Sequence, residues 1–141
     1  MPSVRYHVKA PFEKPIRLLT SVPGIGVTTA VTLMVELDDI VCFRNADHLA
    51  SFIGLVPMCH SSGESNGTGD ITVRRHFMLR SLLVEAAWVT IRKDPAMTVA
   101  YTEYRKRMNP QKSIIKIARR LVNRIYYVLK HEKEYIPCVV K

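Results

Sequence analysis

The sequence predicts an all-α domain of about six helices. Apolar residues recur at helical spacing in its longer segments, most strongly from Lys112 to His131. Prolines, glycines and polar cap residues punctuate the chain between these segments. Its 141 residues suffice for one domain, and a composition of 48% apolar and 23% charged residues is typical of a globular chain. We divide the chain into a lead-in segment (1–15), a domain (16–135) and a tail (136–141).

The first two helices are expected to flank a turn-rich stretch, Pro23–Gly26, with Pro15 near the start of the first helix and Leu37 near the end of the second. Both glycines can adopt positive φ, and the isoleucine between them should point inward. This pattern is typical of a helix-hairpin-helix, whose exposed amides can cradle a phosphate. A hairpin that only packs is the alternative, since a valine follows the second glycine where many DNA-gripping hairpins carry lysine.

A short third helix is predicted over residues 46–53, because Asn45 is a good N-cap and Gly54 a good terminator. The following segment, 57–70, is too rich in turn residues for a helix. We expect one long Ser/Gly-rich loop there, with a short β-hairpin around Asn66-Gly67 as an alternative. A loop of this length in a small domain is usually functional or disordered, and we favour the functional interpretation.

Three further helices complete the prediction. The first spans residues 74–92, with Met78 and Trp88 in the core. Asp94 and Pro95 provide the N-cap and first position of the next, which should reach Met108. The last, 112–131, carries one apolar stripe with basic residues largely off it. That stripe consists of Ile114, Ile117, Ala118, Leu121, Ile125, Val128 and Leu129.

Positive charge is concentrated in the second half of the chain. The net charge is +9, and between Arg74 and Lys130 there are 14 basic residues against three acidic ones. Such a concentration favours a nucleic-acid partner over a membrane, with a merely solvated basic face as the alternative. No apolar run approaches the ~20 residues of a membrane span, and no signal-peptide core begins the chain, so we expect a cytoplasmic protein. Three widely spaced cysteines predict neither a disulfide framework nor a metal site.

Ser61-Ser62-Gly63 in the loop combines nucleophilic hydroxyls with the arginines that follow, Arg74, Arg75 and Arg80. A serine can attack phosphorus while arginines hold the phosphoryl oxygens. The alternative is that Ser-Ser-Gly is ordinary turn chemistry. The predicted phosphate contacts are Gly24, Ile25, Gly26, Arg74, Arg75, Arg80, Lys112, Lys116, Arg119, Arg120 and Arg124.

Several motifs occur in the order known from one family. They include Ser21-Val22-Pro23-Gly24-Ile25-Gly26, Phe43-Arg44-Asn45-Ala46, Ile53-Gly54-Leu55-Val56-Pro57, Ser61-Ser62-Gly63, Gly69-Asp70-Ile71-Thr72, Leu79-Arg80-Ser81-Leu82-Leu83-Val84-Glu85-Ala86-Ala87, Asp94-Pro95-Ala96 and Lys116-Ile117-Ala118-Arg119-Arg120-Leu121. From about Ile16 to Tyr135 the chain resembles the C-terminal domain (Transposase_20-like) of the insertion-sequence 110/116/902 group of transposases.

The resemblance implies a DNA recombinase whose C-terminal domain supplies a serine that becomes covalently linked to DNA. By this resemblance Ser62 is the nucleophile, with Ser61 the alternative, and Arg80 is a phosphate contact. An N-terminal RuvC-like domain would hold divalent metal (Mg) through four acidic residues, and a structured guide RNA would bridge donor and target. The full-length protein would be a homo-oligomer associated with the bacterial nucleoid.

Two departures from the family pattern matter. Val73-Arg74-Arg75-His76 stands where the family usually has Lys-x-Gly-Asn, so the glycine is missing and extra arginines are present. The acidic metal-binding domain is absent, so we expect a truncated gene product or an excised domain that binds no cofactor and does not cleave DNA alone. The alternatives are a non-catalytic helix-hairpin-helix nucleic-acid-binding module and a packing or dimerisation domain.

Overall fold

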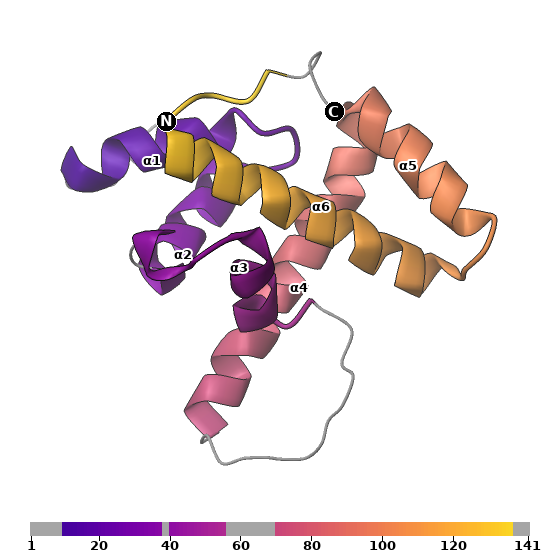
Figure 1. Ribbon diagram of the computed structural model, residues 1–141, viewed down its shortest axis with the longest axis horizontal. Coiled ribbons are helices and arrows are strands. Elements are labelled where there is room, and N and C mark those ends of the chain that lie inside the picture. The colour runs from indigo at the N-terminus through magenta and orange to yellow at the C-terminus, as the bar shows by residue number, and fades with distance from the viewer. Residues whose placement is uncertain (1–9, 38–39, 56–69, 137–141) are drawn as a thin grey trace.

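A computed structural model describes residues 10–37, 40–55 and 70–136. This part of the chain forms six α-helices and one 3₁₀ turn, η1 (Ile40–Cys42), and contains no β-strand (Figure 1). The prediction of an all-α fold is confirmed. No helix among these residues combines the length and apolar character needed to cross a bilayer. The helices are α1 (Ala10–Thr20), α2 (Val27–Leu37), α3 (Ala46–Ile53), α4 (Asp70–Lys93), α5 (Pro95–Arg105) and α6 (Pro110–His131).

Helix α6 is the central element of the fold. It packs against α1, α3, α4 and α5, and in Figure 1 it crosses the middle of the molecule. Nine of its 22 residues are buried, at successive spacings of one or three, so that one side of the helix faces the core. Burial of each leucine or isoleucine side chain stabilises the fold by about 1.5–3 kcal/mol. All seven residues predicted for the apolar stripe are buried.

Helices α1 and α2 pack against each other and are joined by residues 21–26. The first begins at Ala10, so the prediction that Pro15 lies near its start was wrong; Pro15 lies inside the helix. An interior proline ordinarily costs about 3 kcal/mol. Burial of Leu18, Leu19 and Val22 outweighs that cost, because each contributes about 1.5–3 kcal/mol.

The prediction for α3 is confirmed at both ends. The Asn45 side chain accepts a hydrogen bond from the His48 N–H at 2.8 Å, which satisfies one of the unpaired amides of the first turn. Gly54 ends the helix with φ 92°, a left-handed conformation that favours glycine. Leu49 and Ile53 are buried between these caps.

Helix α4 begins at Asp70, four residues earlier than predicted. Its core face contains Leu79, but the placement of Met78 and Trp88 in the core was wrong, because these two residues are 55% and 37% exposed. Each helical residue advances about 100°, so Trp88 lies half a turn away from Leu79 around the axis. Its ring instead packs edge-on against Tyr101 at the surface, with 5.8 Å between centroids.

Helices α5 and α6 begin with the same signature, an N-cap followed by proline. Asp94 accepts from the Ala96 N–H at 3.1 Å, and Asn109 accepts from the Lys112 N–H at 2.8 Å. Helix α5 ends at Arg105 rather than Met108. Helix α6 begins at Pro110, two residues earlier than predicted, because a proline at the first helical position loses no hydrogen bond.

The segment after α6 contacts α1 and the turn that joins α1 to α2. Glu132 ends α6 in the left-handed conformation, with φ 56°. Its carboxylate accepts a hydrogen bond from Lys14 Nζ at 2.9 Å, and this bond together with the lysine charge lowers the pKa of Glu132. Further along, the Tyr135 N–H donates to Ser21 Oγ at 2.8 Å. The two contacts join the chain end to α1 and to the turn that follows it.

Candidate nucleic-acid interface

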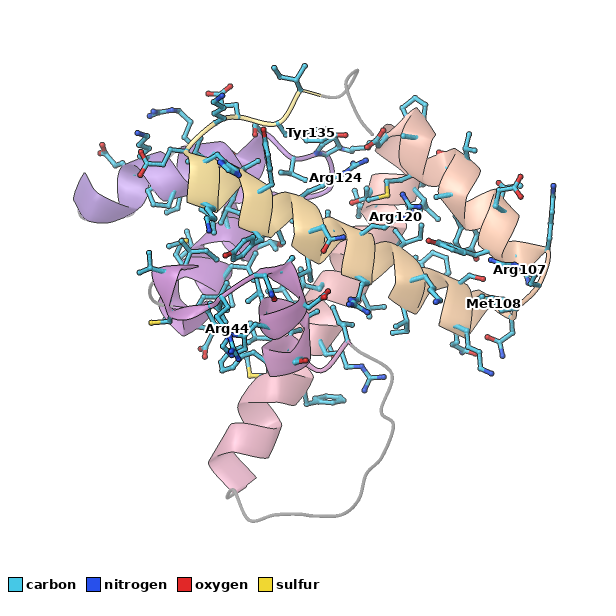
Figure 2. All side chains as sticks on the ribbon, viewed as in Figure 1. Arg44, Arg107, Met108, Arg120, Arg124 and Tyr135 are labelled. Carbon is cyan, nitrogen blue, oxygen red and sulfur yellow. The ribbon has the colours of Figure 1, made fainter. Side chains whose placement is uncertain are left out.

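A groove of about 610 Å³ lies where the end of α3, the middle of α4 and the first turns of α6 meet. We call it the basic groove, because among its described lining residues four are cationic and none is acidic. Leu55, Met108 and Ile115 give it apolar walls; Figure 2 shows Met108 beside the N-terminal end of α6. The four cations are Arg80, Lys112, Lys116 and Arg119.

The start of α6 determines where two of these cations lie. Asn109 and Pro110 begin the helix, so Lys112 falls in its first turn and Lys116 four residues later on the same side. Both side chains are exposed, and neither forms an ion pair within the described part of the chain. They are therefore free to contact an anion.

Arg119 is partly committed to the fold. Its Nη2 atom lies 2.7 Å from the Asp47 carboxylate of α3, and its side chain is 31% exposed. Its Nε atom is buried without a hydrogen-bond partner in the described structure. A buried donor left unpaired costs about 1–3 kcal/mol, so an acceptor entering the groove would relieve a real penalty if it reached this atom.

Arg120 and Arg124, also predicted to contact phosphate, have partners within the protein and do not line the groove. Arg120 Nε donates to the Tyr104 hydroxyl at 2.9 Å, and in Figure 2 its side chain lies between α5 and α6. The Arg124 guanidinium pairs with Asp94 and lies over the Tyr135 ring, 4.6 Å from its centroid. The side chain of Arg124 is only 14% exposed.

The turn between α1 and α2 is docked against α4. Gly24 has φ 100°, and a Cβ there would lie 2.0 Å from Thr90 Oγ1. The Thr90 hydroxyl shares its single proton between two carbonyl oxygens, that of Pro23 at 2.9 Å and that of Ala86 at 2.8 Å. Ile25 is buried at 4% exposure, whereas Gly26 is exposed. The amides that begin α2 are thus the part of this turn available to a ligand.

The predicted nucleophiles Ser61 and Ser62 lie outside the described residues. The backbone of Arg74 and Arg75 belongs to α4, but their side chains are not described. Arg80 is exposed and lines the basic groove. The structure thus brings Arg80 together with Lys112, Lys116 and Arg119, but not with the turn at Gly24–Gly26.

Sequence reasoning missed the apolar walls of the groove and a second hollow beside it. The second hollow, of about 460 Å³, shares Arg80, Gln111 and Ile115 with the basic groove. Phe77 lines it and is 64% exposed. The sequence signal was only a phenylalanine one turn before a predicted phosphate-binding arginine, and its exposure is seen in the structure alone. No three His, Cys, Asp or Glu side chains of the described residues gather as metal ligands.

An all-α core with a basic groove defines a candidate nucleic-acid-binding domain. Comparison with known protein families identifies the family of this chain: the model of the transposase IS116/IS110/IS902 family matches residues 16–102, more than half of the chain. The chain belongs to this family of transposases. The match ends before α6 begins, so the lysines of the basic groove lie beyond it.

Curated relatives agree with this assignment. The chain is 32% identical over 114 residues to the uncharacterized 43.6 kDa protein of insertion element IS110 from Streptomyces coelicolor, covering 80% of this chain and 28% of that protein. It is 34% identical over 125 residues to the pilin gene-inverting protein of Moraxella bovis, covering 84% and 38% respectively. It is 40% identical over 72 residues to the transposase for insertion sequence element IS1111A of Coxiella burnetii, covering 51% and 20%.

The chain therefore spans between a fifth and two fifths of the length of these relatives. No solved structure matches it.

Proposed function

We propose that this chain is the nucleic-acid-binding, serine-carrying part of a DNA transposase. Family membership supports the DNA-rearranging role, as do the names of two relatives, a transposase and a pilin gene-inverting protein. The observation that carries the proposal is the basic groove: four cations gather there beside Leu55, and the segment that contains Ser61 and Ser62 follows Leu55 in the chain.

Chain length limits how far the proposed nucleophile can lie from the groove. Ser62 follows Leu55 by seven residues, and a fully extended chain spans at most ~3.6 Å per residue, so the two lie within roughly 25 Å of each other. A DNA strand held in the groove therefore has phosphates within that radius, because successive phosphates of a duplex strand lie ~3.4 Å apart along its axis.

In the proposed reaction the Ser62 hydroxyl oxygen attacks a scissile phosphorus. The new Oγ–P bond forms as the bond from phosphorus to the 3′ oxygen breaks, the serine proton passes to a base, and the departing oxygen takes up a proton. Ser61 is the alternative nucleophile. Arg80, together with Lys112 and Lys116, holds neighbouring phosphates and stabilises their charge.

Other partners follow from the family and belong to the longer protein. They are an N-terminal RuvC-like domain that holds Mg, a structured guide RNA and further copies of the protein. We expect the isolated chain to bind nucleic acid but not to cleave it.

Binding is tested first with this chain alone and a labelled DNA duplex. If the cations contact phosphates, the logarithm of the association constant falls linearly with the logarithm of salt concentration, by about 0.9 per phosphate neutralised. Weak binding of both DNA and RNA even at low salt would refute a nucleic-acid role and leave a packing or dimerisation domain.

The covalent step is tested by joining the chain to a RuvC-like domain and trapping protein–DNA adducts with cognate DNA and RNA. An adduct that disappears in Ser62→Ala but persists in Ser61→Ala identifies the nucleophile. An adduct that survives both substitutions refutes the serine assignment. If binding is strong and no adduct forms, the non-catalytic binding module becomes the better description.

A further inference from the structure

We infer that the basic groove and the second hollow together bind an unpaired stretch of a nucleic-acid strand, with one base stacked on Phe77. This inference rests on the proposed function, which gives nucleic acid as the ligand, and it specifies that the site binds the unpaired form. The two hollows share lining residues, so one continuous strand can occupy both.

Phe77 is the first observation that points to a base. Its side chain is 64% exposed and lines the second hollow. Arg80 and Ser81 follow it at three and four residues on α4, spacings that place all three on the same side of the helix. An exposed aromatic ring beside a cation is the arrangement with which proteins stack unpaired bases, because every base presents a flat π-face.

The apolar walls are the second observation. Ile115 lines both hollows, and Leu55 and Met108 line the basic groove. A phosphate backbone gains nothing from such walls, since a charged group pays to leave water. A base has an apolar face that does gain from them. The two volumes, about 610 and 460 Å³, fall in the ~300–1,000 Å³ range of sites that enclose small organic groups.

The charges around these walls suit a strand whose bases point inward. Lys112 and Lys116 are exposed at the groove, and Arg80 lies where the two hollows meet. Arg119 adds a buried Nε donor that has no partner in the described structure. Glu85 lines the second hollow, where a carboxylate repels phosphate but can accept from a base amino group. The phosphates therefore belong at the groove and the base at Phe77.

A paired duplex can use only half of this site. Its bases are stacked inside the helix and expose only their edges, so its phosphates can reach Lys112 and Lys116 but no base can stack on Phe77. An unpaired strand can make both kinds of contact. The same chemistry serves DNA opened at a strand-exchange site and an unpaired part of an RNA, so both are tested.

The experiment compares four fluorescent probes with the full chain: a fully paired DNA duplex, a fully paired RNA duplex, and each of these with three unpaired nucleotides at its centre. Dissociation constants are measured by anisotropy. We call the two probes with unpaired nucleotides gapped. We expect the chain to bind at least one of them about fivefold or more tightly than its fully paired counterpart, since stacking of one base contributes about that factor or more. The probe with the larger gain identifies DNA or RNA as the source of the strand.

The variant Phe77→Ala should remove this preference and leave affinity for the paired duplex unchanged, whereas Phe77→Tyr should keep it. Tyr127→Ala is the matched control: Tyr127 is also exposed, at 50%, but it lies on α6 against His131 and outside both hollows. Because Phe77 is exposed, its replacement should not unfold the chain, and circular dichroism verifies this.

Equal affinity for paired and gapped probes, or a preference that persists in Phe77→Ala, would overturn the inference while leaving the proposed function in place. Failure to bind any probe at low salt would instead refute the proposed function itself. A gapped-probe preference that disappears equally in Tyr127→Ala would also count against Phe77 as the stacking platform.

Discussion

The first turns and the middle of α6 both carry cations but use them differently. At the N-terminal end, Lys112 and Lys116 are exposed beside the basic groove and have no ion pair within the described structure. Further along, Arg120 bonds Tyr104, and Arg124 pairs with buried Asp94. The difference shows that a net charge of +9 does not measure a binding surface, because part of that charge holds the fold together.

The largest expected effect tests the ion pair between Arg124, in the middle of α6, and Asp94. Asp94 is 2% exposed, caps α5 and pairs with Arg124, so Asp94→Ala should lower the free energy of unfolding by about 3 kcal/mol or more. Urea denaturation measures the change. Glu103→Ala is the control, since Glu103 pairs with Lys106 on the exposed surface and should shift stability by less than about 1 kcal/mol. Equal effects of the two substitutions would contradict a structural role for the Asp94–Arg124 pair.

A second substitution asks whether the first turn is also built for packing. Gly24→Ala places a Cβ 2.0 Å from Thr90 Oγ1 at a φ of 100°, and should destabilise the fold by about 2 kcal/mol or more. Gly26→Ala is its control, because beyond the two adjacent residues no heavy atom lies within 4 Å of the added Cβ, and the φ of Gly26 is not positive. If thermal denaturation showed the same loss for both, close packing of Gly24 against α4 would not be the cause.

The groove end of α6 should respond in binding rather than in stability. In the double variant Lys112→Gln/Lys116→Gln, the salt dependence of duplex binding should fall by about 0.9 for each phosphate that the lysines no longer neutralise. Its free energy of unfolding should change by less than about 0.5 kcal/mol, because both side chains are exposed. Arg120→Gln should leave the salt slope unchanged. A smaller salt slope in Arg120→Gln would show that the cations of the first turns and those of the middle of α6 are not functionally distinct.

The smallest expected effect concerns Lys14 and Glu132, an exposed pair. Lys14 lowers the folded-state pKa of Glu132 below its ordinary 4.5, so the pair stabilises the fold above that pH and loses its effect as the pH falls below it. The melting temperature of Lys14→Gln should thus lie slightly below that of the unmodified chain at pH 6 and converge with it in acid. Lys133→Gln, which removes a neighbouring exposed lysine, should show no such convergence. A pH-independent difference for Lys14→Gln would contradict this linkage.

Local signals predicted the helices well where the physical cause is itself local. The caps of α3 depend on Asn45 and Gly54, which lie next to the helix they bound. The apolar stripe of α6 was found because its period reflects a single buried face. The start of α4 was missed because its first turn follows a glycine-rich segment and resembles a loop. Trp88 was misplaced because size favoured burial, whereas its angular position on α4 decided otherwise.

The candidate site was only partly predictable, because its composition depends on tertiary contacts. Arg120 and Arg124 looked available in the sequence, but their partners lie 16 and 30 residues away in the chain. The basic groove joins Leu55, Arg80 and Lys112 from three parts of the chain, a combination that no single spacing encodes. Arg80 was identified from its position after the Ser-Ser-Gly segment and again through the family resemblance, whereas Phe77 was singled out only once its exposure was known.

Tyr135 has a consequence for damaged copies of the gene. Its hydroxyl lies 3.3 Å from Asp94 and its N–H donates to Ser21, so this single residue beyond the last helix joins two distant parts of the fold. A nonsense mutation at the codon after His131 would leave all six helices encoded and yet remove this tie. Such a copy would be less stable and more exposed to cellular proteases, so loss of the codons after His131 would lower the level of the gene product although every described helix is still encoded.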